Sequence, residues 1–561
     1  MSRRSSIWIF GVASLLLACE APTGAGPRGA DARSLVVIHT ADLHSHLFPE
    51  PQLIGPADAA RGLGPAGEVA PVGGFARVAR VVNEIRAGAE HSVYLDSGDL
   101  VEGTAAFTEF GGEPELRAFS ALGLSAAALG NHDLSPGAEA FASTHRQFAR
   151  FPVLASNFAN NGSELAAALT PSTVVNAQGI RVGVIGVANP TSPSGLARAD
   201  NPYGIELVPT ARAVQSEIDR LRPEVDVLIA LSHLGLDGDE RLIEGTTGLD
   251  VVLGGHQHLA LDAALERPDC GAALAAERGC HQRTVVLVHS GALGRYVGEL
   301  DLSLAPAAEA SSANIAANGL RVTAAEHSLI AISDEIEEDA ELSELLEPYR
   351  ERLTDAGFDL GLAFARARIE RYAPNGADSA LGDWVTDAMR AQSGADFALL
   401  NSTGIRADLA PGELTRAAFA AALPFADPLT VLTLSGAQLR ALFNQQARVA
   451  SERECQTPIQ ISGLELAFKC SGSGSSAVAR IGSNRELEPT ATYTLVTTAY
   501  LADGGSGFDL LTEASARRSL EVDPLAALLQ SIAGLPSCPE SALPCLDPSA
   551  FRDHRITIRT D

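Results

Sequence analysis

The sequence predicts an α/β protein with two large domains. Short apolar runs that indicate buried strands alternate with stretches whose apolar residues recur at helical spacing, the pattern of a parallel sheet covered by helices. The length of 561 residues exceeds what one hydrophobic core serves, because a domain averages roughly 150 residues. The predicted strands of the first half lie at residues 35–40, 92–95, 126–129, 182–186, 227–231 and 250–253, and the predicted helices at 73–86, about 115–122 and 381–389.

The composition excludes some classes of partner. The chain carries 41 basic and 69 acidic residues, for a formal net charge of −28. This charge argues against binding to a nucleic acid polymer or to an anionic membrane surface. No apolar run after residue 30 approaches the ~20 residues that a membrane-spanning helix needs.

The N-terminus carries a targeting pattern. Arg3 and Arg4 precede an apolar segment at residues 7–17, and the string Leu-Leu-Ala-Cys ends at Cys19. This pattern resembles a bacterial lipoprotein signal, which implies a signal peptide at 1–18, a lipidated Cys19 and a flexible tether over 19–34. The chain is then expected in the bacterial cell envelope, on the periplasmic or cell-surface face, touching the membrane only through the lipid. An ordinary signal peptide or a short anchor helix is the alternative.

The six other cysteines fall into three pairs that are close in sequence. An even number suits three disulfides in an oxidising compartment. A metal–thiolate site is the competing interpretation, but no pair has the Cys-x-x-Cys spacing. The pairs are Cys270 with Cys280, Cys455 with Cys470, and Cys538 with Cys545.

Polar residues follow the first two predicted strands. Asp42 and His44 come directly after residues 35–40, and Asp99 ends the string Asp-Ser-Gly-Asp after residues 92–95. Side chains alternate in extended backbone, so Asp-x-His would point both groups to one side, where they could bind one metal ion. His46 lies one step further along and is not expected to join them. Each motif alone is more often a turn, because aspartate is common there.

Three later strand ends repeat this chemistry. Asn131 offers a neutral amide oxygen to a cation, and His132 places a titratable imidazole beside it. His233 follows residues 227–231, and His256 and His258 follow residues 250–253. Any one of these histidines would more often be structural. Five blocks that hold Asp, Asn or His, each at the end of a predicted strand, point to one metal centre.

This series of motifs resembles the calcineurin-like metallophosphoesterases. The resemblance implies a domain over residues 35–325 that is a four-layer β-sandwich flanked by helices. It also implies two ions, one held by Asp42, His44 and His258, the other by Asn131, His233 and His256, with Asp99 between them. The matching strings are Asp42-x-His44, Gly98-Asp99, Gly130-Asn131-His132-Asp133, His233 and Gly255-His256-x-His258.

Two divalent ions suit phosphate ester hydrolysis. A pair ~3.5–4 Å apart can clamp a phosphoryl oxygen, generate the attacking hydroxide from a bound water and stabilise in-line displacement. Nitrogen and oxygen ligands without sulfur favour zinc, manganese, iron or cobalt, and the sequence does not choose among these metals.

The second half of the chain begins after a change in character. Residues 325–356 are predicted to form a solvated connecting helix with an acidic face, and the linker is drawn at 326–358. Residues 359–561 contain strings that resemble the C-terminal domain of the 5′-nucleotidase family. Together the two resemblances identify the bacterial 5′-nucleotidase and UDP-sugar hydrolase family, in a lipoprotein form. Its C-terminal α/β domain binds the nucleoside and rotates to bring the ester to the metals.

The resemblance assigns substrate contacts to four residues of the second half. Asn401 and Arg406 would contact the substrate, and an arginine fork suits phosphate or ribose oxygens. Phe425 and Tyr500 would hold a base between two aromatic faces. Phe425 could equally be a core residue.

The sequence departs from the family pattern around the catalytic histidine. His132 would stabilise charge on the phosphoryl group or protonate the leaving oxygen, which benefits from a carboxylate that orients the ring. The family places an aspartate at the position of Ser135, so Asp133 is the expected substitute. Ser506 stands where the family commonly has an aspartate that binds ribose hydroxyls, and Arg371 is only a nearby candidate for a phosphate-binding arginine.

The leading hypothesis is an envelope-anchored phosphomonoesterase with a dinuclear metal centre that acts on nucleoside 5′-phosphates. One alternative keeps the architecture but hydrolyses nucleotide sugars, cyclic nucleotides or a sulfur-linked ester. A second is a lipid-anchored binding protein without catalytic activity.

Overall fold

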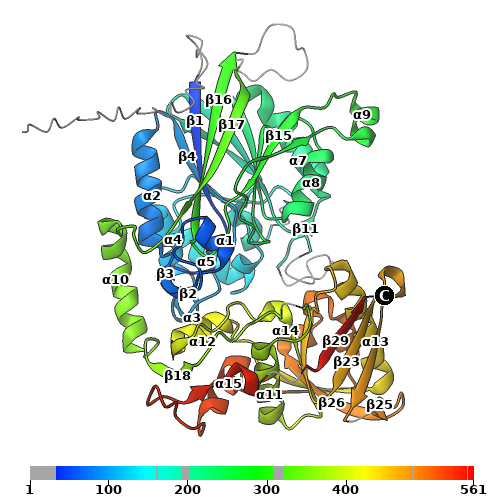
Figure 1. Ribbon diagram of the computed structural model, residues 1–561. Helices are drawn as coiled ribbons and strands as arrows, with labels where there is room; N and C mark the ends of the chain where they lie inside the picture. Colours follow the sequence, from blue (N-terminus) through cyan, green and yellow to red (C-terminus); the bar gives the residue numbers. More distant parts are fainter. Residues whose placement is uncertain are drawn as a thin grey trace, which may run out of the picture.

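The protein consists of two domains joined by a helix. The computed structural model describes residues 33–159, 162–191, 203–306, 320–373, 375–482, 485–551 and 554–560. The first domain lies above the second in Figure 1, and α10 (Ala340–Asp355) runs down one side between them. The predicted signal peptide, Cys19 and the tether up to residue 32 lie outside the described residues. None of the described helices is long and apolar enough to cross a bilayer.

The first domain is built on two large sheets. Strands β1, β4, β5, β6 and β8 of the first sheet are parallel; β16 pairs antiparallel with β1, and β17 pairs antiparallel with β16. Its seven strands in the described chain, in spatial order, are β17 (Leu320–Ala331), β16 (Tyr296–Pro306), β1 (Arg33–Thr40), β4 (Ser92–Asp96), β5 (Ala126–Ala128), β6 (Val153–Leu154) and β8 (Leu169–Thr170).

The second sheet has a parallel centre with an antiparallel strand at each edge. Its six strands in the described chain, in spatial order, are β14 (Leu265–Pro268), β15 (Thr284–His289), β13 (Val251–Gly254), β12 (Val227–Ser232), β10 (Ile180–Val187) and β9 (Ser172–Ala177).

Helices cover the outer face of each sheet. A core of aliphatic residues, among them Leu35, Val93 and Val251, joins the two sheets face to face. Alternate residues of the same strands pack outward against the helices. The helices are α2 (Phe75–Gly88), α4 (Glu113–Ala121) and α5 (Ala138–Phe148) on the first sheet, and α7 (Thr210–Leu221) and α8 (Leu236–Glu244) on the second. The predicted four-layer sandwich is confirmed.

The predicted connecting helix is shorter than expected. Residues 325–331 belong to β17, which pairs with β16 along its whole length. Helix α10 begins only at Ala340, where the Asp339 carboxylate accepts hydrogen bonds from the first-turn amides. It is not fully solvated, because Leu342 and Leu346 are buried in the core of the first domain.

The second domain is also α/β. Its central sheet has one face on a core with α11 (Ala380–Ser393), α12 (Arg416–Ala422) and α15 (Pro524–Ile532), and the other on a core with α13 (Gly436–Glu452). In the described chain this sheet has five strands, in the order β22 (Ile459–Ser462), β19 (Phe397–Asn401), β26 (Thr492–Thr498), β21 (Leu429–Ser435) and β27 (Ala516–Ser519). Two small sheets complete the domain, one of β20 (Gly412–Thr415), β18 (Gly361–Ala365) and β28 (Cys545–Leu546), the other of β25 (Arg485–Glu486), β24 (Ser476–Ile481), β23 (Glu465–Cys470) and β29 (Ile556–Thr560).

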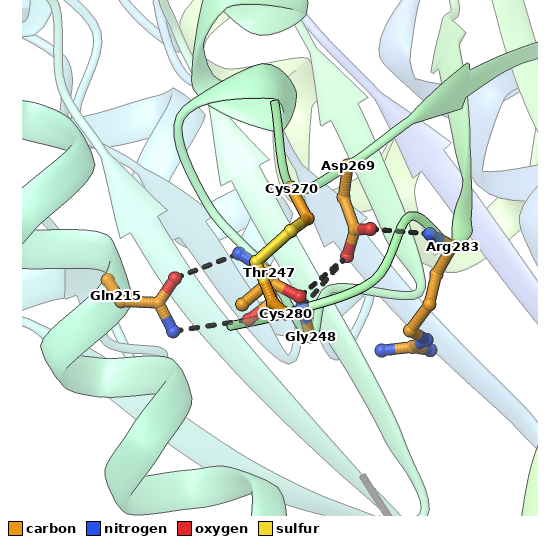
Figure 2. The surroundings of a disulfide bond; sticks show 7 residues. All are labelled: Gln215, Thr247, Gly248, Asp269, Cys270, Cys280 and Arg283. Atoms are coloured by element: carbon orange, nitrogen blue, oxygen red, sulfur yellow. Dashed lines mark hydrogen bonds between the residues drawn. A yellow bond between two sulfur atoms is a disulfide. The ribbon is translucent and has the colours of Figure 1, made fainter. Parts of the chain in front are cut away.

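Two of the three predicted disulfides are present. Cys270–Cys280 closes the segment that carries the exposed helix α9 (Ala272–Arg278), and Cys538–Cys545 closes a loop of the second domain. Beside the first bridge, the Asp269 carboxylate accepts hydrogen bonds from the hydroxyl of Thr247 and from the amides of Gly248 and Arg283 (Figure 2). The third prediction is wrong: Cys455 and Cys470 are thiols. Burial and the neighbouring Cys455 raise the pKa of Cys470 to about 11.

Candidate metal centre

The polar residues that follow the parallel strands meet between the two sheets. Asp42, Asp99 and Asn131 follow β1, β4 and β5 of the first sheet, while His233 and His256 follow β12 and β13 of the second. Carboxyl ends of parallel strands share one edge, so the topology alone gathers these side chains.

Left-handed backbone, not alternation along a strand, aims the ligands. Asp42 and His44 have φ of 52° and 48°, Asp99 has φ of 56°, and His256 and His258 have φ of 76° and 56°. The extended Asp-x-His geometry predicted from sequence is therefore wrong, although both side chains still reach one site. Left-handed non-glycine residues cost on the order of 1–3 kcal/mol and persist where neighbouring contacts hold them.

Those contacts come from one loop docking on another. The amide of Asp42 donates to the carbonyl of Gly98 at 2.9 Å, and the amide of His44 donates to the carbonyl of Asp99 at 3.0 Å. Gly130 lies so close that a Cβ there would stand 2.1 Å from the Asp99 nitrogen. Glycine before Asn131 is thus required by the approach of the Asp99 loop.

One group of ligand atoms comes from Asp42, His44 and His258, which lie within 4.8 Å of one another. The Nε2 atoms of His44 and His258 are 3.0 Å apart, and His258 Nε2 is 3.7 Å from Asp42 Oδ1. Two imidazole nitrogens and a carboxylate at such distances form a set that binds a divalent cation.

A second group comes from Asp99, His233 and His256. His233 Nε2 lies 2.9 Å from Asp99 Oδ2, and His44 Nε2 of the first group lies 3.6 Å from the same oxygen. Asp99 therefore lies between the two groups, in a position where a carboxylate could serve both.

The surrounding hydrogen bonds fit metal ligation. His44 Nδ1 donates to the carbonyl of Glu102 at 2.7 Å, and His233 Nδ1 donates to the carbonyl of Ser97 at 2.7 Å. In both rings Nδ1 is bonded to a carbonyl and Nε2 faces the site, which is how metal-binding imidazoles are oriented. The Oδ1 atom of Asn131 is buried and has no hydrogen-bond partner among the described residues, as expected for an oxygen that serves a cation.

The protonation states of three of the four histidines fit metal ligation, and His233 differs. Burial lowers the pKa of His44 and His258, and lowers that of His256 to about 4, so these rings are neutral, the form that binds metal. Burial alone would lower the pKa of His233, but the Asp99 carboxylate raises it to about 10. Burial alone would raise the pKa of Asp99, but His233 holds it well below its usual range.

Asp133 does not orient His132. Its carboxylate is buried and accepts hydrogen bonds from the amides of Gly130 at 2.8 Å, Leu100 at 2.9 Å and Asp99 at 3.2 Å. Asp133 lies in the 3-10 turn His132–Leu134, and its carboxylate joins the loop after β5 to the loop after β4. The catalytic role expected for Asp133 is therefore not supported by its position.

The carboxylate beside His132 is that of Glu102. Its Oε2 atom lies 2.6 Å from His132 Nδ1, and the hydroxyl of Ser135 donates to the same oxygen. Sequence reasoning missed Glu102. Its place three residues after Asp99 was the available signal, but an acidic side chain in a loop is too common to be singled out.

The second domain reaches the metal centre through Arg406. Its Nη2 atom is 3.2 Å from His44 Nε2 and 3.5 Å from His258 Nε2. Arg371 donates to the carbonyl of Arg406 at 2.5 Å and so supports this loop. Phe425 stacks on His132 with ring centroids 5.9 Å apart, so two of the four predicted substrate residues contact the metal centre or its histidine.

The other two lie further out. Asn401 ends β19, and its amide group donates to the hydroxyl of Thr403 at 2.8 Å. Tyr500 is 41% exposed in α14 (Ala499–Ala502), and its hydroxyl accepts a hydrogen bond from the amide of Ser506 at 3.1 Å. Burial raises the pKa of Tyr203, with smaller contributions from Tyr500 and Glu102.

Comparison with known proteins gives two family matches. Residues 35–260 match the calcineurin-like phosphoesterase model, and residues 360–513 match the model of the 5′-nucleotidase C-terminal domain. A 5′-nucleotidase of the electric ray Diplobatis ommata is 26% identical over 85% of this chain and 83% of its own.

Two solved structures share the arrangement of the whole chain. A 5′-nucleotidase precursor from Thermus thermophilus is 25% identical, with a TM-score of 0.76 over 94% of this chain and 99% of its own. The sulfate thiohydrolase SoxB of Thermus thermophilus, solved with glycerol, has a TM-score of 0.69 over 95% of this chain and 97% of its own at 17% identity, which shows a shared fold alone.

Proposed function

Because the chain belongs to the 5′-nucleotidase family of metal-dependent phosphoric ester hydrolases, we propose that it removes phosphate from nucleoside 5′-phosphates at a centre of two divalent metal ions. Arg406 is the observation that carries this proposal. It belongs to the domain that matches the 5′-nucleotidase model, and its guanidinium lies 3.2 Å from a ligand nitrogen of the phosphoesterase domain. A phosphate bound there would meet a fork that donates two hydrogen bonds.

Seven residues would hold the two ions. Asp42, His44 and His258 serve one ion, Asn131, His233 and His256 serve the other, and Asp99 is shared. Zinc, manganese, iron and cobalt all suit these ligands. When bound, such a pair supplies Lewis acidity for the phosphoryl oxygens and a strong nucleophile from water at neutral pH.

His132 acts on the substrate beside this centre. Because Nδ1 is bonded to Glu102, Nε2 is the nitrogen left to donate a proton to the phosphoryl group or the leaving oxygen. Phe425 covers one face of the ring, which restricts its orientation.

In this proposal the nucleobase of the substrate binds to the second domain. Phe425 and Tyr500 offer aromatic faces, and Asn401 and Arg406 offer donors to phosphate or ribose oxygens. Stacking tolerates any purine or pyrimidine, so the proposal does not specify the base. In the same proposal the domains rotate against each other to deliver the ester.

A second candidate keeps the chemistry but changes the ester. The hydroxyl of Tyr500 is bonded to Ser506, where the resemblance implies an aspartate that binds ribose, so ribose recognition is the weakest part of the match. Nucleotide sugars, cyclic nucleotides or a sulfur-linked ester are the substrates to compare. A binding protein without activity is the remaining alternative. It does not explain why the Asp99 carboxylate lies between two groups of metal-binding side chains.

The anchoring of the chain remains part of the proposal. Cys19 would carry the lipid and place the enzyme at the cell envelope. Mass spectrometry of Cys19 in membrane fractions tests this, and an unmodified, unprocessed N-terminus would contradict it.

The experiment for the proposed function measures phosphate release and metal content on one sample. Purified chain loaded with Mn²⁺ or Zn²⁺ is assayed with nucleoside monophosphates, UDP-glucose, cyclic AMP and p-nitrophenyl phosphate. Preference for a nucleoside 5′-monophosphate, with two ions per chain, supports the proposal. Preference for another ester supports the second candidate, and a chain without ions or activity supports the binding role.

A further inference from the structure

The orientation of His132 depends on what its Nδ1 atom binds. The ring lies edge-on to His44 with centroids 4.8 Å apart, and Phe425 stacks on it. Its ligand atom lies within 4.8 Å of those of His44 and Asp99. A small rotation would carry the ring away from the substrate, so a partner on Nδ1 controls how well His132 can act.

Glu102 is that partner. Its Oε2 lies 2.6 Å from His132 Nδ1, and the side chains of His132 and Glu102 are only 19% and 12% exposed. An ionised acceptor makes a stronger bond than a neutral one and fixes the proton on Nδ1.

Ser135 completes the arrangement. Its hydroxyl donates to the oxygen of Glu102 that faces His132. The serine thus secures a carboxylate that comes from a different loop.

The backbone of Glu102 is fixed independently of its side chain. The amide donates to Ser45 Oγ at 3.1 Å, the carbonyl accepts from His44 Nδ1 at 2.7 Å, and φ is 67°. A glutamate held in the left-handed region by contacts on both sides presents its carboxylate in one direction. The same residue therefore touches a metal ligand through its carbonyl and His132 through its side chain.

We propose that Glu102 is the positioning residue of His132 and that Ser135 secures its carboxylate. The inference rests on the proposed function only in that His132 acts on the substrate. It predicts that the carboxylate can be supplied from either loop.

The experiment compares Glu102→Gln, Ser135→Asp and the double variant Glu102→Gln/Ser135→Asp in the metal-loaded full-length chain. Glu102→Gln keeps the backbone contacts and should lower kcat by on the order of 100-fold, with KM and metal content within about twofold, since the loss falls on general acid–base assistance. The double variant should have a kcat at least about tenfold higher than that of Glu102→Gln. Glu109→Gln is the matched control, because Glu109 is exposed on helix α3 (Ala105–Phe110), and its kcat should not change.

Two results would overturn the proposal. One is a Glu102→Gln enzyme with wild-type kcat, and the other is a double variant no better than Glu102→Gln. A fall in metal content that accounts for the whole loss would assign Glu102 to support of His44 and would equally overturn it.

A second readout does not depend on turnover. In ¹⁵N-histidine spectra of the zinc-loaded chain, the His132 signal, assigned by its absence in His132→Gln, should show a proton on Nδ1 and should shift in Glu102→Gln. An unmoved signal would contradict the contact. If p-nitrophenyl phosphate is hydrolysed but nucleotides are not, the proposed function fails, while the Glu102 comparison is still decided with p-nitrophenyl phosphate.

Discussion

The metal centre and the substrate face of the second domain are held in different ways. Asp42, Asp99 and His233 are at most 1% exposed, and their positions are set by hydrogen bonds to the backbone of neighbouring loops. Tyr500 is 41% exposed, and its hydroxyl is bonded to a single short loop. In the proposed function, hydrolysis would depend on the buried centre, and the choice of ester would depend on a few accessible side chains that can change without disturbing it.

The largest effect should come from breaking the core of the metal centre. Asp99→Asn keeps the shape of the side chain but removes the charge shared by both ligand groups, so activity should fall by more than about 100-fold, beyond the loss typical of outer-shell changes. Elemental analysis should show fewer than two ions per chain. The control is Asp237→Asn, at an exposed position of α8. An Asp99→Asn enzyme with two ions and full activity would contradict the importance of this carboxylate to the metal centre.

A smaller effect is expected from Arg406→Ala in the second domain. Losing charged hydrogen bonds worth about 1.5–3 kcal/mol should raise KM by roughly 10–100-fold. Metal content should stay unchanged, because Arg406 is not a ligand. Arg448→Gln, exposed on α13, serves as the control. Loss of metal from the Arg406 variant would show that the two regions are not separable.

The pKa of His233 gives a prediction for metal uptake. Because that pKa is raised to about 10, a divalent ion must displace a proton at neutral pH. Affinity should rise with pH by up to about tenfold per unit and level off near pH 10. Calorimetry in buffers of different ionisation enthalpy measures the protons released. The Asp99→Asn variant should release fewer protons on binding metal. An equal number of protons would contradict the pairing of His233 with Asp99.

The same pair sets the pH dependence of the metal-free fold. The raised pKa of His233 contributes stability that is complete below its ordinary pKa of 6.5 and is lost as pH rises through about 10. The lowered pKa of Asp99 contributes stability that is present above 3.8 and is lost as pH falls through its folded value. Thermal unfolding of the metal-free chain should therefore show that the His233–Asp99 pair contributes less to the free energy of unfolding at pH 10 than at pH 6.

The smallest effect concerns the accessible region. Ser506→Asp should lower KM for ribonucleoside monophosphates by roughly fivefold, the value of about 1 kcal/mol for one hydrogen bond. It should leave p-nitrophenyl phosphate unaffected, and Ser506→Ala should match the wild type. An equal change in KM for both substrates would show that residue 506 does not contact the ribose.

The sequence predicted the strands and the ligands because both are local properties. Apolar runs located β1, β4, β10, β12 and β13 to within a few residues, and the polar residues that follow β1, β4, β5, β12 and β13 converge on the candidate metal centre. The prediction failed where tertiary contacts decide. Glu102 becomes relevant only once separate loops meet, Asp133 turns toward amides that sequence cannot place, and residues 325–331 join β17 because β16 is beside them.

The guanidinium of Arg406 has a consequence for charge balance. Two carboxylates, Asp42 and Asp99, face the proposed pair of divalent ions, and Arg406 adds a further positive charge within 3.2 Å of His44 Nε2. Such a set is electrostatically incomplete until an anion lies among its members. With both proposed ions bound, the centre would favour doubly ionised phosphate esters over neutral ones, whatever group the ester carries.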